Sequence, residues 1–207
     1  MIPIGSQGRR GQIIFLNGTS SSGKSSIAGQ LLLMLDPPHF HMSVDAINGM
    51  RAKQKTRELD DAGLRAVLSR TRAGFHRAVA GMAEAGNDVI VDHVLSEPWR
   101  LLDCLAVMAG YRVVFVGVRC APAELERRER ERGDRTQGVA LAQEPLVHAH
   151  SLYDVECDTT TASPYDCAVP HQGFSPQRVG ALGLRPAQVA AAMRAAGRSG
   201  NAEAALQ

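Results

Sequence analysis

The segment Gly18-Thr19-Ser20-Ser21-Ser22-Gly23-Lys24-Ser25 constrains the fold of this chain more than any other feature. It matches the pattern G-x-x-x-x-G-K-[ST], in which two glycines let successive backbone N–H groups turn inward and form a cradle for phosphate oxygens. An apolar run over residues 13–16 precedes it, and Ile27, Leu31 and Leu35 follow it at helical spacing. We therefore predict a buried strand, a tight loop and a helix, with a nucleotide-phosphate site at the helix N-terminus.

Alternating strands and helices are predicted along the rest of the chain. Short apolar or β-branched runs predict strands over residues 12–16, 41–44, 88–91, 112–118 and 153–157. Helical spacing of apolar residues predicts helices over residues 25–35, 58–85, 98–109, 123–132 and 139–151. This alternation favours an α/β fold, in which a parallel sheet is covered by helices on both faces.

The length of 207 residues suffices for one sizeable core. We expect residues 1–11 to form a flexible leader and residues 12–161 to form the folded domain. After Thr161 repeated prolines exclude one long closing helix. Residues 162–207 are therefore predicted to be an irregular or helical extension, with an Ala-rich helix over residues 186–196.

Composition excludes several classes of protein. Lys and Arg number 23 and Asp and Glu number 21, so the net charge of +2 gives no electrostatic footprint for nucleic acid or an anionic membrane. The longest apolar run, residues 113–118, is far shorter than the roughly 18 residues of a membrane span. The four cysteines form no Cys-x-x-Cys pair, which indicates reduced thiols. We expect a cytoplasmic protein that binds neither nucleic acid nor membrane.

Charged and hydroxyl side chains after the predicted strands indicate phosphate and metal chemistry. Lys24 can neutralise the β- and γ-phosphates, and the Ser25 hydroxyl can bind Mg²⁺. Asp92 follows a buried strand, where it is either a helix N-cap or a second Mg²⁺ ligand. Asp45, 21 positions after Lys24, is either an N-cap or the group that accepts the proton of a substrate hydroxyl.

The segment from Glu124 to Arg135 is dense in charge. Pairs such as Glu124–Arg128 and Glu126–Arg130 are typical of a solvated helix, and we interpret Arg127, Arg128 and Arg130 in this way. Gly133 is expected to end that helix. Arg132 and Arg135 flank it and are predicted to reach over the nucleotide, where an arginine neutralises charge on the transferred phosphoryl group.

Several motifs occur in an order that resembles the chloramphenicol 3-O-phosphotransferase family of P-loop kinases. They are Ile13-Ile14-Phe15-Leu16-Asn17-Gly18 leading into Ser21-Ser22-Gly23-Lys24-Ser25, Val44-Asp45, Val89-Ile90-Val91-Asp92, Val116-Gly117-Val118-Arg119-Cys120, Arg132-Gly133-Asp134-Arg135, Val147-His148, and Tyr153-Asp154-Val155-Glu156 with Asp158-Thr159-Thr160. The resemblance covers residues 12–161. The later motifs make it more specific than the phosphate loop alone, which many kinases share.

The resemblance implies a P-loop kinase-type three-layer fold with a five-stranded parallel sheet, helices on both faces and a helical lid at about residues 122–137. The residues implied to hold the phosphates of ATP are Gly18, Thr19, Ser20, Ser21, Ser22, Gly23, Lys24, Ser25 and Ser26. Asp45 would be the catalytic base, Arg132 and Arg135 would belong to the lid, and Asp158, Thr159 and Thr160 would lie near the adenine. The family reaction moves the γ-phosphate of ATP to an alcohol of an antibiotic.

The acceptor itself is left open. Residues 46–75, where a family member shapes its acceptor pocket, carry Arg51, Lys53, Lys55 and Arg57 and few aromatic residues. Such a wall suits a polar or anionic acceptor, unless these charges simply face water. The sequence also allows a small-metabolite kinase of primary metabolism or a nucleotide-dependent switch without an acceptor, and it leaves the oligomeric state open, a homo-oligomer included.

Overall fold

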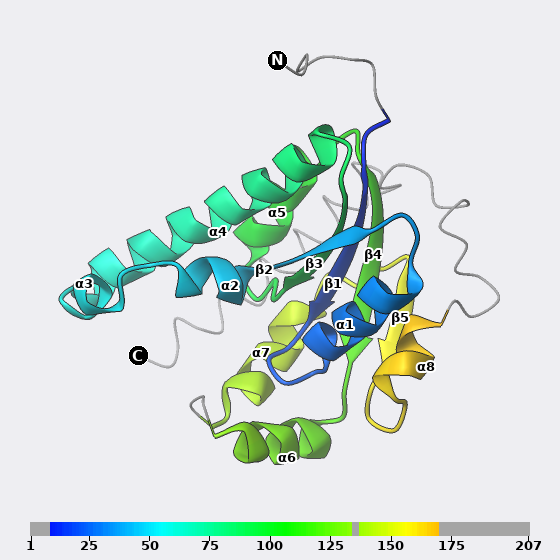
Figure 1. Ribbon diagram of the computed structural model, residues 1–207. Helices are drawn as coiled ribbons and strands as arrows, with labels where there is room; N and C mark the ends of the chain where they lie inside the picture. Colours follow the sequence, from blue (N-terminus) through cyan, green and yellow to red (C-terminus); the bar gives the residue numbers. More distant parts are fainter. Residues whose placement is uncertain (1–8, 134–136, 170–207) are drawn as a thin grey trace.

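The computed structural model describes residues 9–133 and 137–169. Its centre is one sheet of five parallel strands in the order β2-β3-β1-β4-β5 (Figure 1). The strands are β1 (Gln12–Gly18), β2 (His39–Ser43), β3 (Asp88–His93), β4 (Arg112–Arg119) and β5 (Val155–Asp158). The predicted five-stranded parallel sheet is therefore confirmed.

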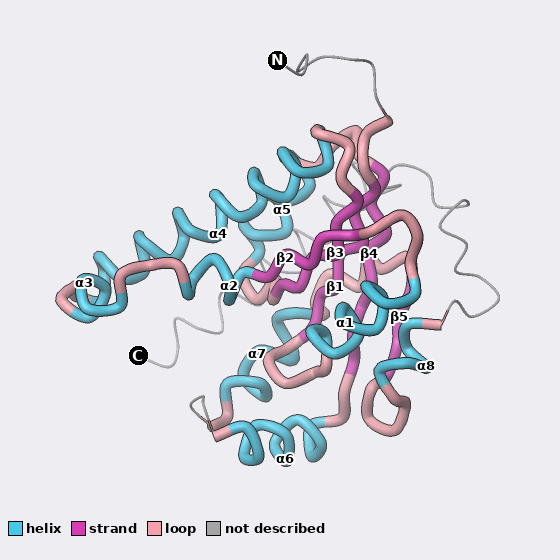
Figure 2. The backbone as a smooth tube through the Cα atoms, in the orientation of Figure 1, coloured by secondary structure: helices cyan, strands magenta, loops and turns pink. Residues whose placement is uncertain are grey.

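Helices cover both faces of this sheet, which makes three layers (Figure 2). The helices are α1 (Lys24–Met34), α2 (Val44–Gly49), α3 (Lys53–Arg57), α4 (Asp61–Glu84), α5 (Pro98–Val107), α6 (Pro122–Arg132), α7 (Val139–Val147) and α8 (Pro164–Ala168). Side chains alternate between the faces of a strand, so Ile13 and Phe15 of β1 pack toward α4 and α5. Ile14 and Leu16 pack on the opposite face against α1 and α8.

The second strand and the segment after it differ from the prediction. β2 ends at Ser43, one residue before the predicted end at Val44. The Ser43 hydroxyl instead accepts a hydrogen bond from the Ala46 N–H at 3.1 Å and caps α2. Neither α2 nor α3 was predicted, because each spans less than two turns and α3 buries no side chain.

Most other boundaries follow the expected signals. Pro98 begins α5, and Gly133 ends α6 in the left-handed conformation with φ of 63°. α7 ends at Val147, four residues before the predicted end, and β5 begins two residues later than predicted.

The packed structure continues past residue 161, where we expected the folded domain to end. α8 carries a capping box between Ser163 and Asp166, and its Ala168 is buried against the α1 face of the sheet. The expected flexible leader lies largely outside the described residues, and the predicted helix over residues 186–196 lies wholly outside them. Among the residues that are described, no helix combines the length and apolar character needed to cross a lipid bilayer.

Candidate active site

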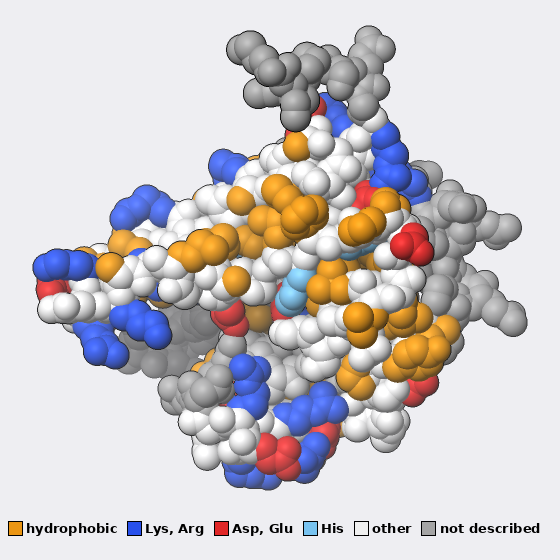
Figure 3. All heavy atoms as spheres, viewed as in Figure 1, with side chains coloured by type: hydrophobic (Ala, Val, Ile, Leu, Met, Phe, Trp, Pro, Cys, Tyr) orange, Lys and Arg blue, Asp and Glu red, His pale blue; other side chains and the backbone are white. Residues whose placement is uncertain are grey.

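A cleft of about 430 Å³ opens at the carboxyl edge of the sheet, where ligands bind in open parallel sheets. We call one side the loop wall, formed by Ser20, Ser21, Gly23, Lys24, Ser25, Ser26, Asp92 and Thr159, and the other the α2 wall, formed by Ser43, Val44 and Asp45. α6 contributes Arg128, Glu131 and Arg132. The space-filling view is hollowed between α2 and α6 (Figure 3). The cleft thus brings the phosphate loop, Asp45, Asp92 and Arg132 together, as predicted.

The phosphate loop has the conformation that its glycines predict. A Cβ at Gly18 would lie 2.6 Å from the Val118 carbonyl oxygen, so only glycine fits there. Gly23 has φ of 90°, and Ser21 also has a positive φ, of 60°. The Lys24 ammonium folds back and donates to the Thr19 carbonyl at 2.6 Å. This curled loop with a lysine across it is a cradle for anions.

Two hydroxyl groups of this loop have the chemistry to bind an anion. The Ser21 and Ser22 side-chain oxygens are buried and have no hydrogen-bond partner within the described residues. In the same loop no side chain caps the N-terminus of α1. Buried polar groups are normally hydrogen-bonded, so these groups fit a bound phosphate chain.

Asp92 is not a helix N-cap, because it lies inside β3 and faces the phosphate loop. It accepts a hydrogen bond from the Ser25 hydroxyl at 2.5 Å, and Lys24 lies 3.8 Å away. Burial raises the pKa of its carboxyl, but His41, Lys24 and Ser25 outweigh burial and bring the pKa below its ordinary value. An ionised carboxylate and a hydroxyl side by side are the oxygen ligands that Mg²⁺ prefers.

Asp45 is the second residue of α2 and lines the cleft. The N-cap alternative is wrong for Asp45 as well, because Ser43 caps this helix. The carboxylate is therefore positioned at the cleft and does not act as a cap.

The turn after β5 braces the phosphate loop. The buried Thr159 hydroxyl donates to the Ser22 carbonyl at 2.8 Å, and Arg128 donates to the Thr159 hydroxyl and carbonyl at 3.1 and 2.6 Å. Asp158 accepts hydrogen bonds from Thr160, whose hydroxyl accepts from the Ala121 N–H at 2.8 Å. Contact of these three residues with adenine stays a prediction, since only Thr159 of the three lines the cleft.

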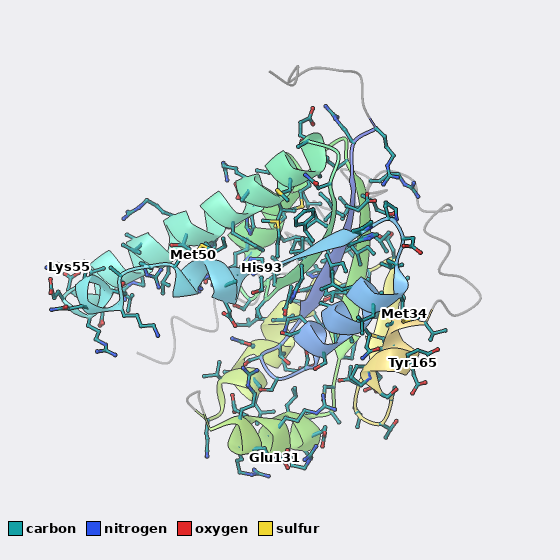
Figure 4. All side chains as sticks on the ribbon, in the orientation of Figure 1. Met34, Met50, Lys55, His93, Glu131 and Tyr165 are labelled. Carbon is teal, nitrogen blue, oxygen red and sulfur yellow. The ribbon has the colours of Figure 1, made fainter. Side chains whose placement is uncertain are left out.

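Most charged side chains of α6 pair with one another along the helix, as expected for a solvated helix. Arg127 pairs with Glu124 at 2.7 Å, and Arg130 lies 4.0 Å from Glu126. Arg132 reaches the cleft from the last turn, and Figure 4 shows its neighbour Glu131 on the same helix. Arg135 lies outside the described residues.

Arg128 and His93 also line the cleft, although neither was among the predicted site residues. Arg128 is not simply solvated, because it joins α6 to Thr159. The helical spacing of Arg128, Glu129 and Arg132 from the buried Leu125 indicates the inward face of α6. No comparable sequence signal marks His93, whose Nε2 lies 3.1 Å from Nε2 of the buried His76.

A buried polar cluster supports the loop wall from below. The Asn17 amide donates to the Val147 carbonyl at 3.0 Å and to the Tyr153 hydroxyl at 2.8 Å, and its oxygen accepts from the Leu95 N–H. His148 lies 2.7 Å from the same Tyr153 hydroxyl. Burial lowers the pKa of His148 and of His150 to about 4. This cluster ties β1 to α7 and to the segment before β5.

A sequence model of the family described as chloramphenicol phosphotransferase-like protein matches residues 11–172. The chain belongs to this family. One relative is a protein of Mycobacterium tuberculosis strain H37Rv whose name assigns it provisionally to the O-phosphotransferases. The two sequences are 31% identical over 178 residues, and the matched region covers 76% of this chain and 79% of the relative. A protein of strain CDC 1551 with the same kind of name has the same identity and coverage.

Solved structures share the fold at low identity. The M. tuberculosis APS kinase, solved with AMPPNP and APS, has a TM-score of 0.58 and 18% identity and covers 77% of this chain and 94% of that chain. The Deinococcus radiodurans tunicamycin resistance protein has a TM-score of 0.57 and 16% identity, with coverages of 77% and 92%. Family membership and this P-loop kinase fold make the protein a small-molecule kinase.

Proposed function

We propose that the protein transfers the γ-phosphate of ATP to a hydroxyl group of a small natural product such as an antibiotic. The observation that carries this proposal is that one cleft holds both the phosphate loop and the Asp45 carboxylate on its opposite wall. The family to which the chain belongs supports an antibiotic as the acceptor. The four cysteines of this chain are free thiols, which suits the reducing cytoplasm as the site of action.

Each wall has its own task in this reaction. The phosphate loop, which forms most of the loop wall, binds the phosphates through backbone N–H groups, the Ser21 and Ser22 hydroxyls and the Lys24 ammonium. Asp45 orients the acceptor hydroxyl and takes its proton as the oxygen–phosphorus bond forms, while the bond between the γ-phosphorus and the β,γ-bridging oxygen breaks and ADP leaves. Arg132 neutralises charge on the transferred group.

Ser25 and Asp92 fit a magnesium site, because their oxygens lie together beside the loop and Asp92 is held ionised. The described residues contain no group of three or more His, Cys, Asp or Glu side chains that could hold a metal alone. Mg²⁺ usually keeps few protein ligands and takes its others from phosphate and water. When bound, it supplies charge neutralisation on the phosphates.

The decisive experiment compares Asp45→Asn with the wild type. ADP formation is measured with chloramphenicol and with a panel of other alcohols, and affinity for an ATP analogue is measured in parallel. We expect turnover to fall by about 10³-fold, within the range of general base catalysis, with nucleotide affinity retained. Asp61→Asn, at an exposed position of α4, is the matched control and should keep full turnover.

Two results would contradict the proposal. If Asp45→Asn phosphorylates its acceptor at the wild-type rate, Asp45 is not the base. If the wild type hydrolyses ATP slowly and no alcohol changes that rate, the protein is a nucleotide-dependent switch and not a phosphotransferase.

A further inference from the structure

Two arginines meet beside the α2 wall. Arg51 lies two residues after the end of α2, and its guanidinium donates to the Thr56 hydroxyl at 3.1 Å and to Asn48 Oδ1 at 3.3 Å. A third hydrogen bond, at 3.3 Å, reaches the hydroxyl of Thr71, the residue before Arg72 on α4. These contacts hold the Arg51 guanidinium next to the part of α4 that carries Arg72.

Neither guanidinium has a carboxylate partner within hydrogen-bond or ion-pair distance in the described part of the chain. The three partners of Arg51 are neutral, and Arg72, which is half-buried, has no hydrogen bond or ion pair there. Burial and, to a smaller extent, the charge of Arg51 lower the pKa of Arg72, and the charge of Asp45 acts more weakly in the opposite direction. Two partly desolvated cations side by side are unfavourable unless an anion joins them.

The position of this pair connects it to the cleft. α2 packs on α4, so Asp45, Arg51 and Arg72 belong to one corner of the molecule. The charge of Arg72 also reaches His93, which lines the cleft and whose Nδ1 is buried without a hydrogen-bond partner within the described residues. Figure 4 shows His93 beside α2, whereas Lys55 lies at the far tip of α3.

Other basic groups nearby are already engaged. The buried Arg100 donates to the Val94 carbonyl at 2.9 Å and to the Ser96 hydroxyl at 3.0 Å, and it pairs with Glu97. Lys24 belongs to the phosphate loop. Arg51 and Arg72 are thus the cations of this corner that lack an anionic partner among the described residues.

The cleft beside this pair, whose described lining includes neither Arg51 nor Arg72, offers little to an aromatic acceptor. Of the described residues that line it, none is Phe, Tyr or Trp, and serine, aspartate and arginine predominate on the walls. A wall of this kind binds charged and hydroxylated molecules better than a nitrophenyl ring.

We propose that the acceptor is an alcohol that carries an anionic group, a carboxylate or a phosphate, and that Arg51 and Arg72 bind this group while its hydroxyl lies at Asp45. The guanidinium fork matches the two oxygens of such a group. The anion fixes the distance from the arginine pair to the reacting hydroxyl, so the pair acts as a specificity determinant. This inference rests on the proposed kinase function and narrows its substrate class.

The first test is a comparison of matched acceptors. ADP formation is measured with a panel of hydroxy acids, each paired with its methyl ester, and in a separate arm with sugar phosphates paired with the free sugars. We expect the anionic member of a pair to be the better substrate. Arg72→Gln and Arg51→Gln should each raise KM for that substrate by about 10–100-fold, the range of a charge-assisted hydrogen-bonded contact, and lower kcat less.

Arg70→Gln is the matched control, since Arg70 is exposed on the same helix. Its KM should equal that of the wild type. A neutral alcohol that is phosphorylated with a higher kcat/KM than every anionic counterpart would overturn the inference and leave the proposed kinase function intact.

The second test needs no turnover. The phosphate loop is saturated with AMPPNP and Mg²⁺, and the melting temperature is measured against millimolar sulfate at constant ionic strength. We expect sulfate to stabilise the wild type and Arg70→Gln, and to have no such effect on Arg72→Gln or Arg51→Gln. An equal sulfate effect in all four proteins would overturn the inference. Because this readout is independent of catalysis, it decides the question even if no alcohol is phosphorylated and the kinase proposal fails.

Discussion

The two walls of the cleft are built differently. The loop wall is half buried and cross-braced: its Ser20, Lys24, Asp92 and Thr159 are buried, the Ser20 N–H donates to Gln143 of α7, and Thr159 donates to the carbonyl of Ser22 behind the wall. The α2 wall buries only Val44, and α3 beyond it buries no side chain. The phosphate loop thus lies in the more buried half of the cleft, and the half proposed to bind the acceptor is the more exposed one.

The position of the strands explains this difference. β1 is the central strand, pairs with β3 and β4 on its two sides, and is buried along its whole length. β2 lies at the edge of the sheet, and its Phe40 is exposed. The loop that follows β1 therefore has neighbours on both flanks and opens only to the cleft, whereas the helices that follow β2 lie at the edge of the sheet.

The largest difference between the walls should appear in kcat/KM for ATP when one lysine charge is removed from each side. Lys24→Gln takes a buried ammonium from the loop wall, and we expect kcat/KM for ATP to fall by about 10³-fold because Lys24 is the cation within residues 18–25 of the phosphate loop. Lys53→Gln makes the same change at an exposed position of α3 and should leave kcat/KM for ATP within about twofold. Steady-state kinetics check both, and equal losses would show that the walls are not distinct.

A smaller effect is expected from the brace behind the loop. Thr159→Ala removes the hydroxyl that joins Ser22, Arg119 and Arg128, and should lower the free energy of unfolding by about 1–3 kcal/mol. Urea unfolding measures the loss, and affinity for an ATP analogue should weaken in parallel. Thr161→Ala, at an exposed position two residues on, should change neither quantity; an unchanged Thr159→Ala protein would mean that the brace is not needed.

The last predicted effect is a gradual dependence of stability on pH through the cluster beneath the loop wall. His148 and His150 have pKa values of about 4 in the folded chain and about 6.5 when unfolded, so below pH 6.5 the unfolded chain binds protons that the folded chain does not. Stability is therefore fully present above pH 6.5 and should fall by about 2–3 kcal/mol per histidine toward pH 4.5.

Urea unfolding at pH 7, 6, 5 and 4.5 measures this dependence. His148→Gln should flatten the decline because one of the two titrating groups is gone. A wild-type protein that becomes more stable between pH 7 and pH 5 would contradict the assignment.

The sequence predicts the loop wall far better than the α2 wall. Residues 13–16 and 113–118 are continuous apolar runs, which predict buried strands. Two glycines and a lysine at this spacing between a strand and a helix are typical of a phosphate loop, so the loop and the start of the helix also follow from local pattern. The α2 segment has only Val44 and Ile47 to pack on the core, too few for a periodic signal.

The remaining errors come from tertiary structure. The end of β2 was predicted one residue too late because Val44 is apolar, and only the packing of α2 shows that Ser43 acts as a cap. Arg128 resembles its charged neighbours in sequence, and its role appears only where the turn after β5 meets α6. Contacts between segments far apart in the chain carry no local signature.

The pairing of β3 with its neighbours has a further consequence. Leu16 lies opposite Asp92 and Asn17 opposite His93, and these two β3 side chains point to opposite faces of the sheet. A single residue inserted within β3 would exchange them and turn the carboxylate away from Ser25. Extra residues at the exposed tip of α3 would shift no strand, so natural or engineered length variation should accumulate there.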